Sequence, residues 1–317
     1  MENILRYSHS SRRPKHRFSP KRFLFGLVFL LILFLVLKWS GGFFIKDTLQ
    51  DSSELLAKDS FDKSKKSLAD LEKDIKELVD TKKGSWSVYF VDYSKDQSLD
   101  LNKNVIHRAA SVNKLFVLAS AYFLADRKEI DLDETISLQA RDIQDYGTGT
   151  IRYDAPGTIY SLKTLARLLI EKSDNTAEYI LRTVIGDGKI QSLIESWGMK
   201  QTSLSDNKTS LSDVELLFKK IKNNEIAGFA ATAEMFDFLL ETDFEDRLPA
   251  LLPKDVSVFH KIGNEVGNIH DVGLIKKGDA TYFLGVLSSD INDTEEEAVK
   301  TIAKISQMVY DFKYGNK

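Results

Sequence analysis

The distribution of apolar and polar positions divides the chain into segments of different character. Residues 23–37 form an unbroken apolar run, and Trp39 and residues 43–45 extend it beyond the single charge of Lys38. Together they approach the ~20 residues that a membrane-spanning helix needs, with the Lys38 side chain reaching toward the membrane surface. Buried helices of soluble domains rarely carry so long an apolar run. The pattern therefore predicts a transmembrane helix over residues 23–45.

The flanks of this span indicate its orientation. Residues 1–22 contain several arginines and lysines and one acid, Glu2. Basic flanks of this kind stay in the cytoplasm, so residues 1–22 are predicted as a cytoplasmic tail and everything after residue 45 as extracellular. A cleaved signal peptide is the alternative, but no Ala-x-Ala-like cleavage site follows the apolar run. Polar residues 46–63 are predicted as a stalk, followed by a folded domain over residues 64–317.

Within residues 64–317, strands are predicted near both ends and helices between them. Helical periodicity marks residues 64–82, 162–172, 176–185, 189–197, 211–222, 233–240 and 295–312, and a buried helix is predicted from Ser111. Segments rich in β-formers lie at residues 86–93, 97–101, 256–261, 269–275 and 281–287. This order predicts an α/β (α+β) fold, in which N- and C-terminal helices flank an antiparallel sheet and an all-helical lobe is inserted.

Composition narrows the chemistry that this domain can perform. The formal net charge of −3 offers no electrostatic basis for nucleic-acid binding. The chain has no cysteine, which excludes disulfides, thiolate catalysis and zinc–thiolate sites. No phosphate-binding loop or cluster of metal ligands is found, so neither a cofactor nor a metal is expected.

A serine and a lysine on one predicted helix turn are the strongest candidates for chemistry. Ser111 and Lys114 precede a long apolar run, and positions i and i+3 share a helix face. Ser111 is expected at the helix N-terminus, as an N-cap or first-turn residue. A buried lysine can lose its proton near neutral pH and accept one from a serine hydroxyl. The motif alone is weak, because Ser-x-x-Lys also occurs at residues 60–63 and 205–208.

Two further motifs give the first one context. Ser173-Asp174-Asn175 lies between two predicted helices, and Lys261-Ile262-Gly263 lies at the end of the strand predicted over residues 256–261, which Lys261 ends. Copies of both patterns occur elsewhere, at residues 205–207, 82–84 and 276–278, but not between such elements. In order, spacing and local structure, the three motifs resemble the serine β-lactamase and penicillin-binding protein family, class A β-lactamases in particular. The resemblance covers about residues 86–312, with one departure, Ile262 in place of the family's threonine.

The resemblance implies a role for each residue of the three motifs. Ser111 would attack a strained lactam or a peptide carbonyl, with Lys114 as the candidate base. Ser173 would pass a proton to the leaving nitrogen. Lys261 would bind the substrate carboxylate and help to lower the pKa of Lys114. The expected substrates are β-lactams or the D-Ala-D-Ala stem peptides of peptidoglycan, which places the protein at a bacterial cell surface.

The resemblance also implies where the substrate binds. Asn175, Gly263 and Asn264 would contact it, Asn175 through a hydrogen bond to its amide side chain. The backbone N–H groups of Ser111 and Asn264 would form an oxyanion hole. Ile262 cannot donate the hydroxyl hydrogen bond of the family's threonine, so weaker recognition of the substrate carboxylate is expected.

Other interpretations of these residues remain open. His107, His260 and His270 suggest a Ser-His-Asp triad, but the chain lacks a Gly-x-Ser-x-Gly turn, so we interpret them as packing or strand-edge residues. Asp174 is expected to hold its loop. A second functional hypothesis is an inactive descendant of the family that serves as a binding or scaffold module, for which Ile262 leaves room.

A last prediction concerns release of the acylated serine. Class A β-lactamases hydrolyse the acyl-enzyme with a glutamate from a loop after the Ser-Asp-Asn motif. The corresponding stretch here, residues 200–208, contains no glutamate, and its acid, Asp206, is expected to cap a turn. The sequence therefore predicts acylation by β-lactams with slow deacylation.

Overall fold

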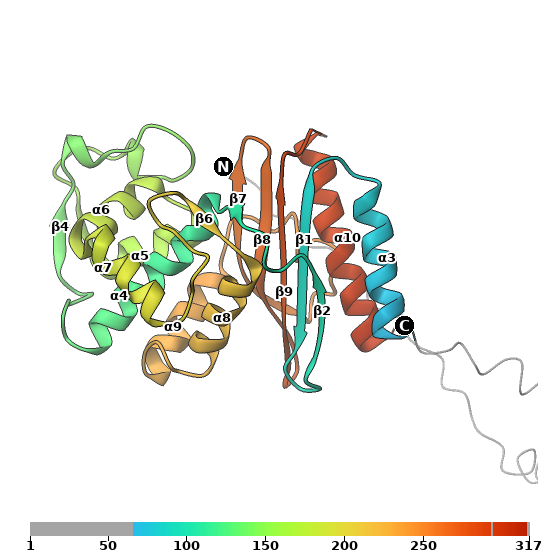
Figure 1. The fold of residues 1–317 in the computed structure, drawn as a ribbon. Helices are drawn as coiled ribbons and strands as arrows, with labels where there is room; N and C mark the ends of the chain where they lie inside the picture. The colour runs from blue at the N-terminus through green and yellow to red at the C-terminus, as the bar shows by residue number, and fades with distance from the viewer. Residues whose placement is uncertain (1–65, 293, 316–317) are drawn as a thin grey trace, which may run out of the picture. The chain divides into compact units, whose positions relative to one another are not determined.

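A five-stranded antiparallel sheet lies at the centre of the computed structural model, which describes residues 66–292 and 294–315 (Figure 1). The strand order is β2-β1-β9-β8-β7. The strands are β1 (Ser85–Asp92), β2 (Gln97–Leu101), β7 (Ser257–Glu265), β8 (Asn268–Lys277) and β9 (Ala280–Ser289). Strand β1 pairs with β9, so the first and last strands of the domain meet in one sheet. This confirms the antiparallel sheet predicted from the two ends of the domain.

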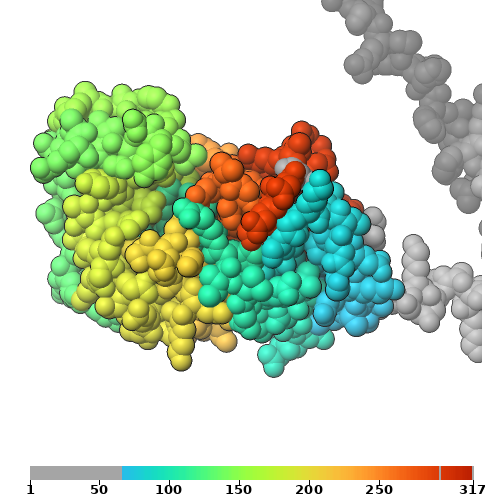
Figure 2. Space-filling view, turned by 45° about the horizontal axis from the view of Figure 1, so that its top comes forward, coloured from blue at the N-terminus to red at the C-terminus, as the bar shows by residue number. Residues whose placement is uncertain are grey.

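Helices cover both faces of this sheet (Figure 1). Helices α3 (Leu68–Asp80) and α10 (Glu295–Tyr314) contact each other and lie on one face. The lobe beside the other face contains α4 (Lys114–Asp126), α5 (Leu162–Glu171), α6 (Asn175–Ile185), α7 (Asp187–Ser196), α8 (Leu211–Lys222) and α9 (Phe229–Leu240). The space-filling view shows the green and yellow helical lobe beside the orange and red strands (Figure 2).

Alternation along β9 explains why the sheet is buried on both faces. Phe283 and Leu287 belong to the apolar core shared with the helical lobe, whereas Tyr282, Leu284 and Val286 belong to the core beneath α3 and α10. Successive side chains of a strand point to opposite faces, so an almost continuous apolar run supplies both cores. The sheet thereby becomes a rigid layer that carries one wall of the site.

Two short strand pairs within the helical part were not predicted. β3 (His107–Arg108) pairs with β6 (Lys208–Thr209), and β4 (Thr135–Ser137) pairs with β5 (Ile159–Ser161). Such short pairs leave little periodicity in the sequence, because their partners lie far along the chain. The β3–β6 pair matters for the site, since it joins the segment before Ser111 to the loop that follows α7.

The predictions for the N-terminal part of the chain fall outside the described residues. They concern the basic tail over residues 1–22, the membrane span over residues 23–45, the stalk over residues 46–63 and the start of the folded domain at residue 64. Among the described helices, none combines the length and the apolar character that a bilayer crossing requires. Residues Lys66–Lys317 form one compact unit.

Candidate active site

Ser111 lies on a tight turn rather than in the predicted α-helix. Residues Ala110–Asn113 form a 3-10 turn, and α4 begins at Lys114, so Ser111 does not cap the helix with its side chain. Ala110 has a φ of 48°, a left-handed conformation that is costly for a residue with a Cβ atom. The apolar residues of α4 are buried on nearly all sides, which holds this strained turn in place. The turn places Ser111 in the wall of a cleft.

Lys114 is almost completely buried, with 1% exposure, and its amino group is surrounded by oxygens. Its Nζ donates to the carbonyl oxygen of Ser173 at 2.6 Å and to Asn175 Oδ1 at 2.7 Å. Ser111 Oγ lies 3.1 Å from the same nitrogen. A neutral amine would give its two hydrogens to the first two oxygens and direct its lone pair at the Ser111 hydroxyl. The arrangement therefore suits proton transfer from Ser111 to Lys114.

The Ser173-Asp174-Asn175 motif connects α5 to α6, as predicted. Ser173 has a φ of 50°, a second left-handed residue with a Cβ atom in the site. Asp174 caps α6 by accepting a hydrogen bond from Ala177 N at 2.9 Å. Its other oxygen accepts from Thr150 N and Ile151 N at 2.6 and 2.9 Å. This confirms the prediction that Asp174 holds its loop.

The loop containing Gly147 and Gly149 packs directly on this motif. A Cβ atom on Gly149, which has a φ of 121°, would lie 2.4 Å from the Asp174 carboxyl carbon. Thr148 Oγ1 donates to the carbonyl oxygen of Ser173 at 2.7 Å. Asn175 Nδ2 donates to the carbonyl oxygen of Tyr146 at 3.0 Å, which fixes Asn175 Oδ1 toward Lys114. The loop thus orients the polar side chains that face Ser111.

Lys261 reaches the same centre from β7. Its Nζ donates to Ser173 Oγ at 2.9 Å, and that hydroxyl oxygen lies 3.2 Å from Lys114 Nζ. Strand β7 continues to Glu265, so the prediction that the strand ends at Lys261 was wrong, and Asn264 lies within the strand. A Cβ atom on Gly263 would lie 2.9 Å from the carbonyl oxygen of Ala109. Glycine therefore allows β7 to pass the turn that carries Ser111.

Burial dominates the protonation of both lysines. It lowers the pKa of Lys114, while the carboxylates of Glu178 and Asp174 oppose this shift. Burial, followed by the charge of Lys114, lowers the pKa of Lys261 well below its usual value. The expected lowering for Lys114 is present, but its main cause is burial rather than the charge of Lys261. Both groups are thus closer to neutral than surface lysines.

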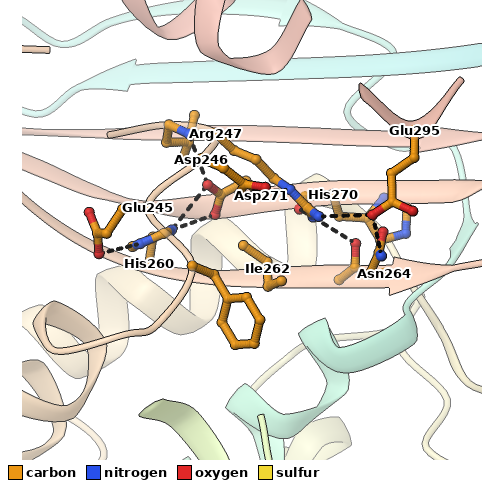
Figure 3. A network of polar contacts seen from close by, with 12 residues as sticks. Glu245, Asp246, Arg247, His260, Ile262, Asn264, His270, Asp271 and Glu295 are labelled. Atoms are coloured by element: carbon orange, nitrogen blue, oxygen red, sulfur yellow. Dashed lines mark hydrogen bonds and ion pairs between the residues drawn. The ribbon is translucent and has the colours of Figure 1, made fainter. Parts of the chain in front are cut away.

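A polar network behind β7 supports this strand (Figure 3). His260 Nδ1 lies 2.8 Å from Asp271 Oδ1, and both side chains are fully buried. Burial lowers the pKa of His260, but the carboxylates of Asp271 and Glu245 together outweigh it and raise the pKa to about 9. The other ring nitrogen of His260 faces Thr242 and Glu245. The pair therefore forms a structural ion pair and does not activate Ser111.

The other two histidines are also packing residues. Burial lowers the pKa of His107 and of His270 to about 4. His107 bonds Ser87 Oγ at 2.8 Å, and His270 bonds the carbonyl oxygen of Arg108 at 2.7 Å. These contacts confirm the interpretation of all three histidines as structural. Their ring nitrogens bind groups other than Ser111, so they do not form a Ser-His-Asp triad with it.

Arg247 and Glu295 connect the same network to the end of β7 (Figure 3). Arg247 Nη1 donates to the carbonyl oxygens of Gly263 and His270 at 3.2 and 2.8 Å. Glu295, the first residue of α10, accepts a bond from Asn264 Nδ2 at 2.6 Å and lies 3.9 Å from Arg247 Nη2. The Asn264 side chain thus holds the strand to α10, which leaves its backbone as the part available to a substrate.

The cleft beside Ser111 has a volume of ≈ 850 Å³. Its lining includes Glu178, Leu204 and Asn207, to which the sequence analysis assigned no role in the site. Glu178 Oε2 lies 3.6 Å from Lys114 Nζ. Glu178 stands three residues after Asn175 on α6, so helical spacing from the motif was the signal that could have found it.

Residues 200–208 form a short loop beside the cleft. Asn207 Oδ1 accepts a hydrogen bond from Asn113 Nδ2 at 2.8 Å, and its carbonyl oxygen accepts one from Ala109 N at 2.8 Å. Leu204 lines the cleft, whereas the exposed Asp206 faces Lys208 at 3.9 Å. The loop therefore offers an apolar side chain to the cleft rather than a carboxylate. Among the described residues, no group of three or more metal-binding side chains is found.

The fold and the Ser111–Lys114–Ser173–Lys261 cluster define a serine hydrolase of the β-lactamase type. The chain belongs to the β-lactamase enzyme family, whose family model matches residues 70–312. Fold and family therefore agree with the resemblance carried by the three motifs.

Individual relatives agree with this assignment. A β-lactamase from Bacteroides uniformis is 26% identical over 271 residues, covering 77% of this chain and 91% of the relative. The structure of PBP-A is 25% identical, with a TM-score of 0.71, and covers 77% of this chain and 96% of its own. A PBP-A mutant with glutamate in place of a leucine, solved as an acyl-enzyme with penicillin G, has a TM-score of 0.72. The TLA-1 extended-spectrum β-lactamase, 21% identical over 78% of this chain and 99% of its own, shares the fold with a TM-score of 0.72.

Proposed function

We propose that the protein is a membrane-anchored, extracellular acyl-transferase or hydrolase in which Ser111 forms an acyl-enzyme with β-lactams or D-Ala-D-Ala cell-wall peptides. The observation that carries this proposal is the position of Lys114 Nζ, 3.1 Å from Ser111 Oγ and hydrogen-bonded to two oxygens that only accept. A lysine held in this way is a base for a serine nucleophile.

Acylation follows from the positions of the hydroxyl and amino groups. Ser111 Oγ attacks the substrate carbonyl carbon while Lys114 accepts its proton. Ser173 Oγ, which lies between Lys114 Nζ at 3.2 Å and Lys261 Nζ at 2.9 Å, passes a proton to the leaving nitrogen. Lys261 holds this hydroxyl and supplies positive charge for a substrate carboxylate.

The substrate is held by the edge of β7 and by α6. The backbone N–H groups of Ser111 and Asn264 form the oxyanion hole, and one such donor contributes ~3 kcal/mol in other hydrolases. Gly263 brings the strand close to the Ser111 turn, so the two donors converge. Asn175 Oδ1 accepts a bond from Lys114 and keeps a second lone pair for the amide of the substrate.

Deacylation is slow in this proposal. The loop over residues 200–208 presents Leu204 to the cleft, and its carboxylate, Asp206, is exposed and faces Lys208. In class A enzymes this loop carries the glutamate that activates the hydrolytic water. Here the loop therefore offers no carboxylate to a water beside the acyl-serine. The protein is accordingly proposed to bind penicillins more than it destroys them.

The proposed location follows from the sequence of the N-terminal part. The basic residues 1–22 and the apolar residues 23–45 support a catalytic domain outside the cell, where stem peptides and β-lactams are found. A cleft of ≈ 850 Å³ is at the upper end of typical ligand sites, which suits a peptide of several residues.

Labelling with a fluorescent penicillin tests the proposal. The wild-type protein is expected to carry a covalent label that persists in intact-mass spectra, and Ser111→Ala is expected to carry none. Fast steady turnover of a chromogenic cephalosporin without a stable adduct would contradict slow deacylation.

Ile262 favours one alternative function, that of an inactive scaffold protein at the cell surface. Isoleucine at this buried position lacks the hydroxyl with which the family threonine recognises a carboxylate. A folded wild-type protein that no penicillin labels would support the scaffold and refute the enzyme.

A further inference from the structure

Glu178 is a carboxylate in the catalytic cleft that none of the three motifs contains. Its Oε2 lies 3.6 Å from Lys114 Nζ, and its Oε1 lies 3.4 Å from Arg182 Nη1. The side chain is 20% exposed and lines the cleft together with Ser111 and Leu204. It therefore contacts the catalytic lysine on one side and the space for substrate and water on the other.

We propose that Glu178 is the general base that hydrolyses the Ser111 acyl-enzyme, supplied by helix α6 instead of the loop that follows α7. This inference rests on the proposed acyl-enzyme function. It identifies the group that carries the slow deacylation.

The distances around Lys114 allow this role. Ser111 Oγ lies 3.1 Å and Glu178 Oε2 lies 3.6 Å from the same nitrogen atom. One water spans about 6 Å through two hydrogen bonds, so it can contact Glu178 and an acyl carbon on Ser111 together. Leu204 lines the same cleft as an apolar side chain.

The hydrolytic step balances with groups present in the site. Glu178 accepts one proton from the water, and the water oxygen bonds to the acyl carbon. The bond from this carbon to Ser111 Oγ then breaks. Lys114, neutral again once its proton has passed through Ser173 to the leaving nitrogen, carries the proton from Glu178 to Oγ. This restores the resting site and releases a carboxylic acid.

Charged groups from several elements surround Glu178 and Lys114. Lys114 from α4 and Arg182 from α6 face the two oxygens of Glu178, and Arg182 is shared with Asp187 of α7 at 2.6 and 2.9 Å. Lys261 from β7 and Asp174 at the start of α6 are the other charged groups near Lys114. Arg182 therefore holds one oxygen of Glu178, and the other oxygen faces Lys114.

The test compares Glu178→Gln with Asp206→Asn as a matched control, because Asp206 is the exposed carboxylate of the loop beside the cleft. Penicillin G is mixed with each protein, and intact-mass spectrometry follows formation and decay of the adduct. Glu178→Gln is expected to prolong the adduct about 100-fold, the lower end for loss of a general base. Asp206→Asn is expected to match the wild type, and Glu178→Asp to restore part of the decay rate.

Acylation provides an independent readout on the same samples. The Glu178 carboxylate opposes the lowering of the Lys114 pKa, so its removal lowers this pKa further. The neutral amine then forms at lower pH, and the pH profile of acylation is expected to shift to lower pH in Glu178→Gln. Equal adduct lifetimes in wild type and Glu178→Gln, or a wild-type adduct that never decays, would overturn the inference. A folded wild type without any adduct would refute the proposed function instead.

Discussion

Burial and a nearby carboxylate act in opposite directions on Lys114. Burial lowers the pKa of the amine, and Glu178 and Asp174 raise it again. The balance decides what fraction of Lys114 is neutral when a substrate arrives. At the level of single residues, the rate of acylation is therefore set by Lys114 and by the charges on α6.

Removal of Lys114 is expected to stop most acylation while the fold survives. General-base loss costs ~10²–10⁴ in rate, so Lys114→Ala should slow acylation by penicillin G at least ~100-fold. The measurement is the second-order labelling rate, with thermal melting to confirm folding and Lys189→Ala, an exposed lysine on α7, as the control. A near-normal rate would mean that another group is the base, and Glu178 would be the first candidate.

Between elements, the pairing of β7 with β8 brings a charged pair into the core. Ile262 pairs with Asp271 and His260 with Gly273, which places the His260 and Asp271 side chains together behind the site. Burying an ion pair costs desolvation free energy, which the attraction between the two charges offsets. This attraction requires a protonated His260, so the contribution of the pair to stability depends on pH.

Stability is expected to depend on pH through His260. Its folded pKa of about 9 lies above the ordinary value of 6.5, so its contribution is fully present below pH 6.5 and disappears as the pH rises through about 9. Urea unfolding of the wild type and of His260→Gln from pH 6 to pH 10 measures this. The difference between their free energies of unfolding should shrink as the pH rises, because His260 then loses its proton in the folded protein. The buried lysines are present in both proteins, so their contribution cancels in this difference. A constant difference across this range would show that the histidine is neutral in the fold.

On the scale of the whole molecule, the expected membrane span puts the basic tail and the catalytic domain on opposite sides of the cell membrane. Residues 1–22 and 23–45, which carry this expectation, lie outside the described residues. The proposal that the domain acts on wall peptides depends on this topology.

Protease treatment of intact cells is expected to release the catalytic domain by cutting in the polar residues 46–63. The measurement is loss of cell-associated penicillin label and appearance of a labelled fragment in the medium. Cells whose membrane has been permeabilised provide the control. Full retention in sealed cells, together with loss after permeabilisation, would place the domain on the cytoplasmic side.

The sequence by itself determined much of the architecture and the three motifs. Residues 211–222 and 97–101 were predicted with the bounds of α8 and β2, because periodic apolar positions record which face of an element is buried. The Ser111–Lys114 pair was also accessible, since both residues lie on one turn of chain. Asp174 was interpreted correctly from its place between two helices.

Tertiary structure decided the features that depend on residues far apart in the chain. Lys114 meets Ser173 and Lys261 only after α4, α5 and β7 have packed together. The same packing buries both lysines, and this burial is the main cause of their lowered pKa values. Helix α6 turns Glu178 toward Lys114, and in the sequence only its spacing of three residues from Asn175 distinguishes it from a solvent-exposed acid. Periodicity reports whether a side chain is buried, whereas packing alone decides which group it meets there.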